Sequence, residues 1–283
     1  MNKLTHWDYC QFLLASQVNY TLTYFADHAR GFSHDAATRY LRGDRLRPSE
    51  LWRQVKGELV VSPKGCLIFD DSVLDKNHSR EIEGVYRQYS GNEHRIIRGI
   101  GLISCVYVNP ETEEFWVIDY RLYDPERDGK DKHQHVSEML DNCLEKCRKG
   151  ELDMQTVLMD RWYAIIKLMT KIHRARLRFY CPIKPNRALS EVRGGEKYRY
   201  QKAEDLVWSE TELALGKAVH LRESPRDFVV KLFRIALSTE GAELIVTNDE
   251  SLRDAQAVQQ VQGLRWKVEQ FHRELKQVTG IEA

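Results

Sequence analysis

Residues Cys66–Asp71 (CLIFDD) and Thr156–Asp160 (TVLMD) decide how this chain can fold. Each is a short apolar run closed by aspartate, the pattern of a buried strand with a carboxylate at its C-terminal end. In a sheet with parallel neighbours, such ends meet at one edge, where sites are built. If the two strands lie side by side, Asp70 and Asp160 come within reach of one metal ion. Adjacent strand residues point to opposite faces, so only one of Asp70 and Asp71 can face that site.

The chemistry of these aspartates allows two interpretations. Carboxylate oxygens are hard ligands that select Mg²⁺ or Mn²⁺. Strand-end aspartates also cap loops and helix starts, and Asp160 precedes a predicted helix. The spacing therefore gives a candidate pair and leaves the choice between Asp70 and Asp71 open.

Outward from these runs, the hydrophobic pattern predicts an α/β fold. Residues 186–248 alternate like β structure, and 254–278 form one long helical pattern. The order is β-β-β-α-β-α-β, then a β-rich insertion, then a helix. The remaining strands are predicted over 97–108, 114–123 and 177–183, and the remaining helices over 135–147 and 162–172.

The sequence divides into four expected parts. Residues 1–60 read as three short helices with a basic C-terminal part, which fits either a helix-turn-helix type of DNA-binding unit or a plain helical cap. Residues 61–185 form the first part of an α/β core, 186–250 the β-rich insertion, and 251–283 the final core helix.

Composition excludes several classes of protein. Apolar residues make up 42% and charged residues 30% of the 283 residues, enough for a real core. No apolar stretch is long enough for a membrane helix, no signal peptide is evident, and six scattered cysteines fit reduced thiols in a cytosol. We therefore expect a cytoplasmic protein without a membrane partner.

The net charge of +1 hides a strong asymmetry along the chain. The segment 171–202 carries ten Lys and Arg against two Glu, whereas 110–154 carries seven basic against thirteen acidic residues. A basic stretch on a neutral chain is what a polyanion such as DNA would bind, although a solvated charged face gives the same pattern.

The last predicted helix carries a polar stripe beside an apolar one. Because a helix brings residues i, i+4, i+7 and i+11 onto one face, the polar stripe would place a carboxylate between cations. An ordinary Arg265–Glu269 salt bridge is the simpler explanation. The polar stripe consists of Arg265, Glu269, His272 and Lys276, and the apolar stripe of Leu264, Val268, Phe271 and Leu275.

Together these motifs resemble those of DDE insertion-sequence transposases. The run 265–276 resembles their Tyr-Arg-Glu-Lys signature, with Arg265, Glu269 and Lys276 at the family spacing and Gln262 at the Tyr position. Residues 70–72 (DDS) look like the first motif, Asp-x-Ser/Thr, and Asp160 with the arginine after it looks like the second. The resemblance covers about residues 60–280.

The resemblance implies a ribonuclease H-like mixed sheet flanked by helices and a nuclease that cuts and joins DNA at transposon ends. Asp70, Asp160 and Glu269 would be catalytic and hold two Mg²⁺ or Mn²⁺ ions for phosphoryl transfer. The Asp-x-Ser/Thr form assigns Asp70 as the ligand, with Asp71 as the alternative. Cut-and-paste movement of double-stranded DNA by a homodimer, in a bacterial cytoplasm at the nucleoid, is the expected setting.

The resemblance also assigns DNA contacts to the last helix. Arg265 and Lys276 would hold DNA phosphates, with Arg273 and His272 beside them. Trp162, just past Asp160, could be a wedge at the site, but we expect it to be a buried helix residue.

Two other functions remain open. One is an inactive or domesticated DNA-binding protein that keeps the scaffold, and the other is a nuclease of the same fold that only hydrolyses. The chain also ends seven residues after Lys276, where members of this class usually continue, so a truncated copy is expected.

Overall fold

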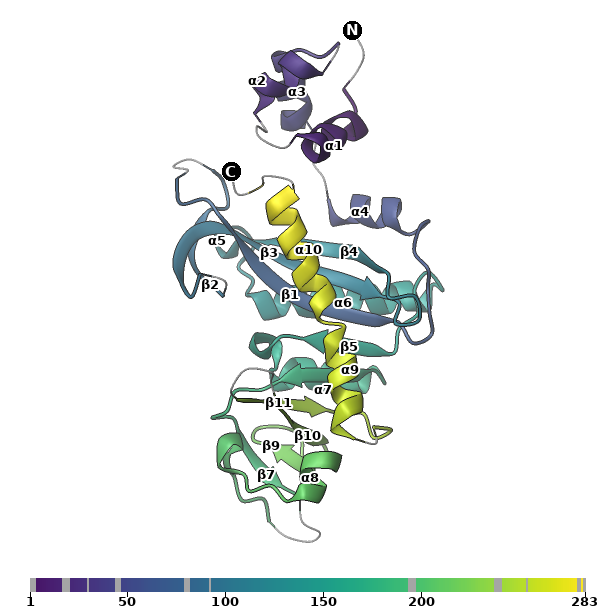
Figure 1. Cartoon of the computed structure of the whole chain (residues 1–283), viewed down its shortest axis with the longest axis vertical. Coiled ribbons are helices and arrows are strands. Elements are labelled where there is room, and N and C mark those ends of the chain that lie inside the picture. Colours follow the sequence, from purple (N-terminus) through teal and green to yellow (C-terminus); the bar gives the residue numbers. More distant parts are fainter. Residues whose placement is uncertain are drawn as a thin grey trace.

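A computed structural model shows how the expected strands and helices are arranged (Figure 1). Its central feature is one large mixed sheet with helices on both faces. The structure describes residues 4–16, 21–29, 31–43, 47–78, 82–91, 93–192, 197–236, 241–252, 254–278 and 281.

The described residues place eleven strands in this sheet, in the order β2-β3-β1-β5-β6-β11-β10-β9-β7-β8, with β4 paired to β3. The sheet therefore continues from the first half of the chain into the second without a break. The strands are β1 (Cys66–Asp75), β2 (Tyr86–Ser90), β3 (Arg95–Val108), β4 (Phe115–Tyr123), β5 (Thr156–Met159), β6 (Arg178–Pro182), β7 (Ala188–Glu191), β8 (Gln201–Lys202), β9 (Lys217–Leu221), β10 (Val229–Ala236) and β11 (Ala242–Thr247).

The centre of the sheet has the ribonuclease H-like arrangement. β1 pairs antiparallel with β3, and β3 with β4, whereas β5 runs parallel to β1 and β6 parallel to β5. The predicted fold class, a mixed sheet flanked by helices, is thus confirmed. β2 was not among the predicted strands, and it extends the antiparallel edge by pairing with β3.

Helices cover the sheet on both faces. Figure 1 shows α9 and α10 crossing the near face, with α6 and α7 behind the sheet. Eight further helical segments, two of them 3₁₀ turns, lie in the described part of the chain. The bounds are α1 (His6–Ala15), α2 (Leu22–His28), α3 (His34–Gly43), α4 (Pro48–Val55), α5 (Pro125–Asp128), α6 (Lys132–Arg148), η1 (Arg161–Tyr163), α7 (Ile166–Arg174), η2 (Ala203–Asp205), α8 (Glu210–Leu215), α9 (Ala255–Gly263) and α10 (Trp266–Val278).

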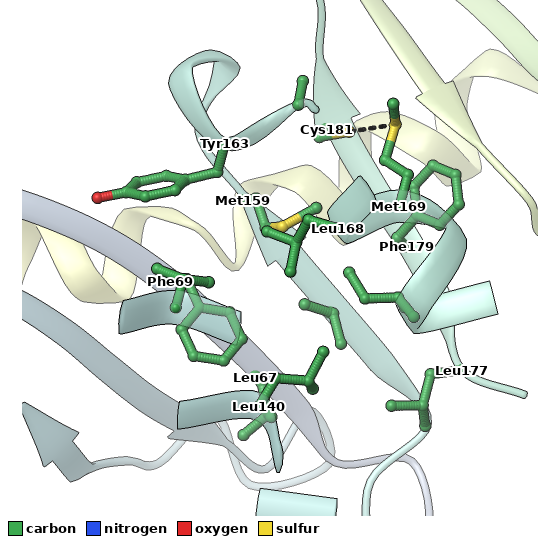
Figure 2. Close-up of a cluster of buried hydrophobic side chains, with 14 of the residues drawn as sticks. Leu67, Phe69, Leu140, Met159, Tyr163, Leu168, Met169, Leu177, Phe179 and Cys181 are labelled. Carbon is green, nitrogen blue, oxygen red and sulfur yellow. Dashed lines mark hydrogen bonds between the residues drawn. The ribbon is translucent and has the colours of Figure 1, made fainter. Parts of the chain in front are cut away.

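Strand β1 contributes to a separate core on each face. Leu67 and Phe69 pack in the cluster that includes α6 and α7, and Cys66 and Ile68 pack in the cluster that includes α9 and α10. Figure 2 shows part of the first cluster, where Phe69 lies near Met159 and Leu168. Both faces of β1 are buried, which explains its continuous apolar sequence.

The segment expected as a β-rich insertion joins the same sheet. Its last strand, β11, pairs antiparallel with β6, with Ile245 opposite Pro182. From there β10, β9, β7 and β8 continue outward. The segment is therefore an extension of the core sheet beyond β6.

The N-terminal helices α1, α2 and α3 form a small cluster of their own around Phe25 and Ala37. Ser33 accepts a hydrogen bond from the backbone N–H of Ala36 at 3.2 Å and so caps the start of α3. A fourth helix, α4, packs on β4 through the buried Trp52. Residues 44–46, part of the predicted basic stretch, lie outside the described residues. In the part of the chain that is described, no helix is long and apolar enough to cross a bilayer.

The last helical pattern is not one helix, and this prediction was wrong. α9 ends at Gly263 and α10 begins at Trp266. Between them the backbone N–H groups of Leu264 and Arg265 bond three residues back, to Val261 and Gln262. A tight turn of this kind, next to a glycine, interrupts the i−4 ladder. The two halves of the pattern are therefore separate helices.

Candidate active site

The parallel pairing of β1 and β5 places two aspartates at one edge of the sheet. Phe69 lies opposite Met159 in the register, and each strand continues directly into its aspartate, Asp70 or Asp160. Both aspartates line one cavity of about 1020 Å³. The two aspartates therefore meet where the parallel ladder ends, but Asp70 does not end its strand as the sequence pattern predicts, because β1 continues to Asp75 along β3.

Helix α10 brings a third carboxylate to this cavity. Glu269 lies one turn after Arg265, and both line the cavity wall. The Arg265 guanidinium contacts Asp160 at 3.1 Å and Glu269 at 3.3 Å. The arginine thus forms the predicted salt bridge within α10 and also joins two carboxylates that are more than 100 residues apart in the sequence.

The alternation of β1 decides which aspartate faces α10. Asp70 follows Cys66 and Ile68 on the face covered by α9 and α10, and Asp71 follows Leu67 and Phe69 on the opposite face. Glu269 belongs to the helix on the Asp70 face. Asp70 is therefore the member of the pair that shares a face with the third carboxylate.

Burial and neighbouring charge make Asp70 hard to ionise. Burial, and then the nearby Asp160 and Asp71 carboxylates, raise the pKa of Asp70 to about 7. Arg265 and a 2.9 Å hydrogen bond from the backbone N–H of Asp71 act in the opposite direction. A cation close to Asp70 would favour its charged form.

Asp71 is held by partners of its own. Lys132, at the start of α6, donates to one carboxylate oxygen at 2.6 Å, and the Tyr163 hydroxyl donates to the other at 2.6 Å. Figure 2 shows the Tyr163 ring at the edge of the buried cluster with its hydroxyl pointing out of it. Burial, and then the Asp71 charge, raise the pKa of Tyr163, so the phenol stays a hydrogen-bond donor. Lys132 and Tyr163 therefore fix the orientation of the Asp71 carboxylate, whereas Asp70 faces Arg265.

Two predicted cations of α10 also line the cavity. Lys276 donates to the backbone carbonyl of Val73 at 2.9 Å, which holds its ammonium beside β1. Arg273 is exposed, and its guanidinium lies 4.9 Å from the centre of the Trp266 ring. Both positive charges are close enough to the carboxylates to meet a phosphate that enters the cavity.

His272 does not lie on the exposed face that its place in the polar stripe predicts. Its side chain is 7% exposed, and its Nε2 is 3.0 Å from the Ser104 hydroxyl on β3. Burial lowers the pKa of His272 to about 4, so the ring is neutral near pH 7. His272 lines the cavity as a neutral ring turned towards β3, so a contact of this residue with DNA would not be made by a charged side chain.

Trp162 is a second correction. The helix expected over 162–172 is a short 3₁₀ turn, η1, followed by α7 from Ile166. Trp162 is 54% exposed and lines the cavity instead of packing in the core. The chain turns sharply after Asp160, with the Tyr163 N–H bonded to the Asp160 carbonyl at 2.9 Å, and this turn buries Tyr163 and leaves Trp162 outside.

The donor set of the cavity suits a hard divalent cation. Asp70, Asp160 and Glu269 supply carboxylate oxygens, and the raised pKa of Asp70 reflects its burial and then the negative charge of Asp160 and Asp71. Among the described residues no group of three or more His, Cys, Asp or Glu is already closed around a point that could hold an ion. The guanidinium of Arg265 lies between two of the carboxylates, so it supplies the positive charge in this arrangement.

Sequence reasoning missed Lys132 and Tyr163, which lie 61 and 92 residues from Asp71. The weak signals were local: Lys132 follows the helix-capping Asp131, and Tyr163 follows Asp160 by three residues. At the Tyr position of the family signature, the buried side-chain amide of Gln262 has no hydrogen-bond partner within the described residues.

Comparisons with solved structures give distant likenesses. Endonuclease V of Ciona intestinalis, in complex with a 24mer DNA, is 13% identical with a TM-score of 0.38, and the match covers 81% of this chain and 97% of that one. Endonuclease V of Bacillus subtilis is 13% identical with a TM-score of 0.33, covering 82% and 95%. The Drosophila P element transposase in a strand transfer complex is 12% identical with a TM-score of 0.25, covering 68% and 50%.

These TM-scores are all below 0.5, so the assignment rests on the sequence family. No curated protein matches the chain. The family described as "Transposase DDE domain" matches residues 62–283, which is most of the chain and includes all three carboxylates of the cavity. The chain therefore belongs to the family of DDE-domain transposases.

Proposed function

We propose that this transposase cuts and joins DNA at transposon ends, with Asp70, Asp160 and Glu269 as its catalytic carboxylates. The observation that carries the proposal is the Arg265 guanidinium between Asp160 and Glu269, in the same cavity as Asp70. Three carboxylates and a cation from three separate parts of the chain line this cavity, which suits the cleavage of a phosphodiester.

The three carboxylates would hold two Mg²⁺ or Mn²⁺ ions. Such ions supply an attacking water or 3′-hydroxyl of lowered pKa and stabilise the leaving oxygen. Asp70, whose pKa is raised by burial and by the Asp160 and Asp71 carboxylates, would hold these ions together with Asp160 and Glu269. Asp71 stays outside this set because Lys132 and Tyr163 already occupy its oxygens.

The cations of α10 would orient the DNA. Arg265 is proposed to exchange its carboxylate partners for a phosphate oxygen once ions bind, since its guanidinium fits either anion. Lys276 and Arg273, on the same cavity wall, would contact neighbouring phosphates. His272 is proposed to hold the helix against β3 through Ser104, with no DNA contact.

Double-stranded DNA is the proposed substrate, both as transposon end and as target. Cut-and-paste movement requires two ends to be handled together, so a homodimer is the proposed active form.

The test uses a supercoiled plasmid that carries the coding sequence with its native flanking DNA. With Mg²⁺, the wild-type protein should release the element and join it to a second plasmid. Glu269→Ala should abolish both steps and still bind the DNA. Hydrolysis without joining would support a simple nuclease instead, and DNA binding without any cutting by the wild type would support an inactive DNA-binding protein.

A further inference from the structure

The start of β3 and the whole of β2 form a two-stranded arm. β2 pairs antiparallel with residues 95–99 of β3. β1 and β4 pair with β3 only from Gly99 and Gly101 onward. Within the described residues, 95–98 therefore have β2 as their only partner strand. Residues 86–90 and 95–98 are called the arm below.

The two faces of the arm differ in exposure and in chemistry. Alternate residues of a strand share a face, and residues opposite each other on paired strands share it too. On one face Ser90 and Ile97 are each 3% exposed, so this face is buried against the protein. On the other face Tyr89 lies opposite Ile96, and their side chains are 60% and 62% exposed. The exposed side, called the arm face, consists of Arg87, Tyr89, Ile96 and Arg98.

The arm face carries positive charge without a counter-charge. Arg87 and Arg98 lie directly opposite each other in the register. Like charges in this position destabilise a strand pair. In the part of the chain that the structure describes, neither guanidinium forms an ion pair. The acids that flank β2 and β3, Glu83 and Glu93, each contact another arginine, at 3.8 and 3.2 Å. The opposed arginines are therefore suited to gain an anion from outside the protein.

Tyr89 places the arm face at the carboxylate cavity. Its side chain lines that cavity together with Gln88 and Gly91 of the same hairpin. The lining also includes Arg273 and Lys276 of α10, the cations proposed to contact DNA phosphates. The opposed arginines are the next residues along the arm face from Tyr89 and its partner. A surface that carries positive charge thus extends from α10 onto the arm.

We infer that the arm face binds the DNA duplex beside the phosphodiester that is cut. Arg87 and Arg98 would contact phosphates, and Tyr89 and Ile96 would lie against sugars and base methyl groups in the groove. A two-stranded β-ribbon fits the major groove of B-DNA, and arginine is a frequent phosphate contact. The inference rests on the proposed function, because that function brings DNA into the neighbouring cavity.

A second copy of this chain suits the arm face less well than DNA. A two-fold interface pairs a surface with itself, so it would bring four of these guanidinium groups together. Their repulsion would oppose such a dimer, whereas a phosphate backbone supplies the opposite charge. The charge of the arm face therefore favours a polyanion. Single-stranded DNA is the remaining alternative, and the first experiment tests it.

The first experiment removes the charge and keeps the length of the side chains. Binding of the full-length protein to a fluorescein-labelled duplex of twenty-four base pairs, and to one of its strands alone, is measured in EDTA by anisotropy. Arg87→Gln/Arg98→Gln should weaken duplex binding at least tenfold. The slope of log K against log salt should fall by about 1.8, since each phosphate contact on a duplex contributes about 0.9. Binding of the single strand should change less than threefold, and an equal loss for both DNAs would overturn the inference.

A matched double variant controls for net charge. Arg148→Gln/Arg174→Gln removes two exposed arginines from the last turns of α6 and α7, outside the cavity lining. This variant should bind the duplex within twofold of the wild type. Equal losses in the two double variants would show an effect of net charge alone and would contradict a site on the arm.

The second experiment separates DNA binding from folding. Arg87→Glu gives the strand pair opposite charges, because Arg98 remains across from the new carboxylate. The temperature of thermal unfolding should therefore stay the same or rise, while duplex binding falls further than in Arg87→Gln. A lower unfolding temperature in both variants would show that the arginine supports the fold, and the inference would be wrong.

The third experiment removes the apolar pair. Tyr89→Ala/Ile96→Ala should weaken duplex binding about three- to tenfold. The salt slope should stay at the wild-type value, since apolar contacts release no counterions. Wild-type affinity in this variant would refute a contact between DNA and this part of the arm face.

The two proposals fail separately. In EDTA no metal-dependent cleavage occurs, so the binding results stand whether or not the plasmid assay shows transposition. If the wild type binds duplex through the arm but never cuts, the proposed function is wrong and the arm site is retained. If it cuts and joins DNA while the arm variants bind normally, the arm site is wrong.

Discussion

Two adjacent cavities of the molecule differ in the sign of their charge. The first is built around Asp70, Asp160 and Glu269. The second, of about 470 Å³, has four cations in its lining, Arg161, Lys184, Arg187 and Arg222. A wall of carboxylates repels a phosphate until cations neutralise it, whereas a wall of guanidinium groups attracts one directly. Under the proposed function, chemistry and attraction of DNA would be divided between these adjacent cavities, which share the Trp162 and His133 side chains.

The difference also shows in how each cavity balances its charge. In the acidic cavity Arg265 and the raised pKa of Asp70 reduce the repulsion between carboxylates. In the basic cavity Arg161 contacts Glu243 at 3.6 Å, and Glu223 lies in the wall, so two acids offset four cations. The first cavity is therefore suited to gain cations and the second to gain an anion.

The adjacent residues Asp160 and Arg161 give the largest test, because each lines one of the cavities. Asp160→Asn should reduce plasmid cleavage by at least about 1,000-fold, the scale seen when an essential catalytic group is lost, and leave DNA binding within threefold. Arg161→Ala should do the reverse, with cleavage at saturating DNA within tenfold and weaker DNA binding. Gel-based cleavage and anisotropy measure the two effects.

The opposite outcome has a clear meaning. If Arg161→Ala abolishes cleavage at saturating DNA as fully as Asp160→Asn, chemistry and binding are not divided between the cavities. Asp160→Glu serves as a further comparison, since it keeps the charge and moves the carboxylate by one methylene.

The next effect concerns the ion pair of Lys132 with Asp71, both of which line the acidic cavity. Lys132→Ala leaves the Asp71 carboxylate largely buried without its ammonium partner, which typically costs about 3–5 kcal/mol. The free energy of unfolding, measured with urea at pH 7.5, should fall by this amount. Lys132→Ala/Asp71→Asn should recover a large part of it, because the unpaired charge is gone. Equal stability of the single and double variants would show that the ion pair does not hold this region.

Asp70 gives a smaller, pH-dependent effect. Its pKa is raised from 3.8 to about 7 in the folded protein, so folding is favoured while the group is protonated in both states. This contribution of Asp70 to the free energy of unfolding is lost as pH rises from about 4 through about 7. Over that range Asp70 ionises in the unfolded chain before it ionises in the folded protein. In EDTA at pH 8, Asp70→Asn should therefore be more stable than the wild type by about 2–4 kcal/mol, at about 1.4 kcal/mol per pKa unit.

At pH 4 the same two proteins should unfold at nearly equal denaturant concentration. Urea titrations at several pH values provide the measurement, and Gln259→Ala, an exposed substitution on α9, serves as a control for general effects. A stability difference that does not change with pH would contradict the raised pKa of Asp70.

The smallest expected effect is stabilisation by metal. At a MgCl₂ concentration ten times the dissociation constant, the wild type should gain about 1.4 kcal/mol from mass action, and Asp160→Asn should gain much less. Thermal unfolding with and without EDTA measures this gain independently of cleavage. If Arg187→Ala/Arg222→Ala gains as much stability from Mg²⁺ as the wild type, the metal does not depend on the basic cavity. If Asp160→Asn also gains as much, the metal is not bound in the acidic cavity.

Local patterns predicted most of the fold. The runs ending in Asp70 and Asp160 are apolar because both faces of their strands are buried. The four residues before each aspartate are enough to indicate such a strand. Strand β2 was missed because its burial alternates between half-exposed and exposed residues until Ser90. The break between α9 and α10 was missed because the helical period continues across it in the sequence.

The side-chain partners in the cavity were less predictable. The ion pair of Lys132 with Asp71 joins residues that only the folded sheet brings together. Periodicity grouped His272 with the polar stripe, yet residues at the margin of a stripe can turn either way, and Ser104 draws this one inward. Trp162 was expected to be buried in a helix over 162–172, but the turn after Asp160 leaves its side chain exposed. Such outcomes depend on tertiary contacts that spacing does not encode.

The use of both faces of β1 makes this strand intolerant of changes in length. Deleting or inserting one residue between Cys66 and Asp70 would either exchange the faces of Asp70 and Asp71, turning Asp71 away from Lys132, or move the apolar side chains before them into the wrong layers. Across related genes, surface loops of this protein should therefore vary in length, while the number of residues leading into Asp70 stays constant.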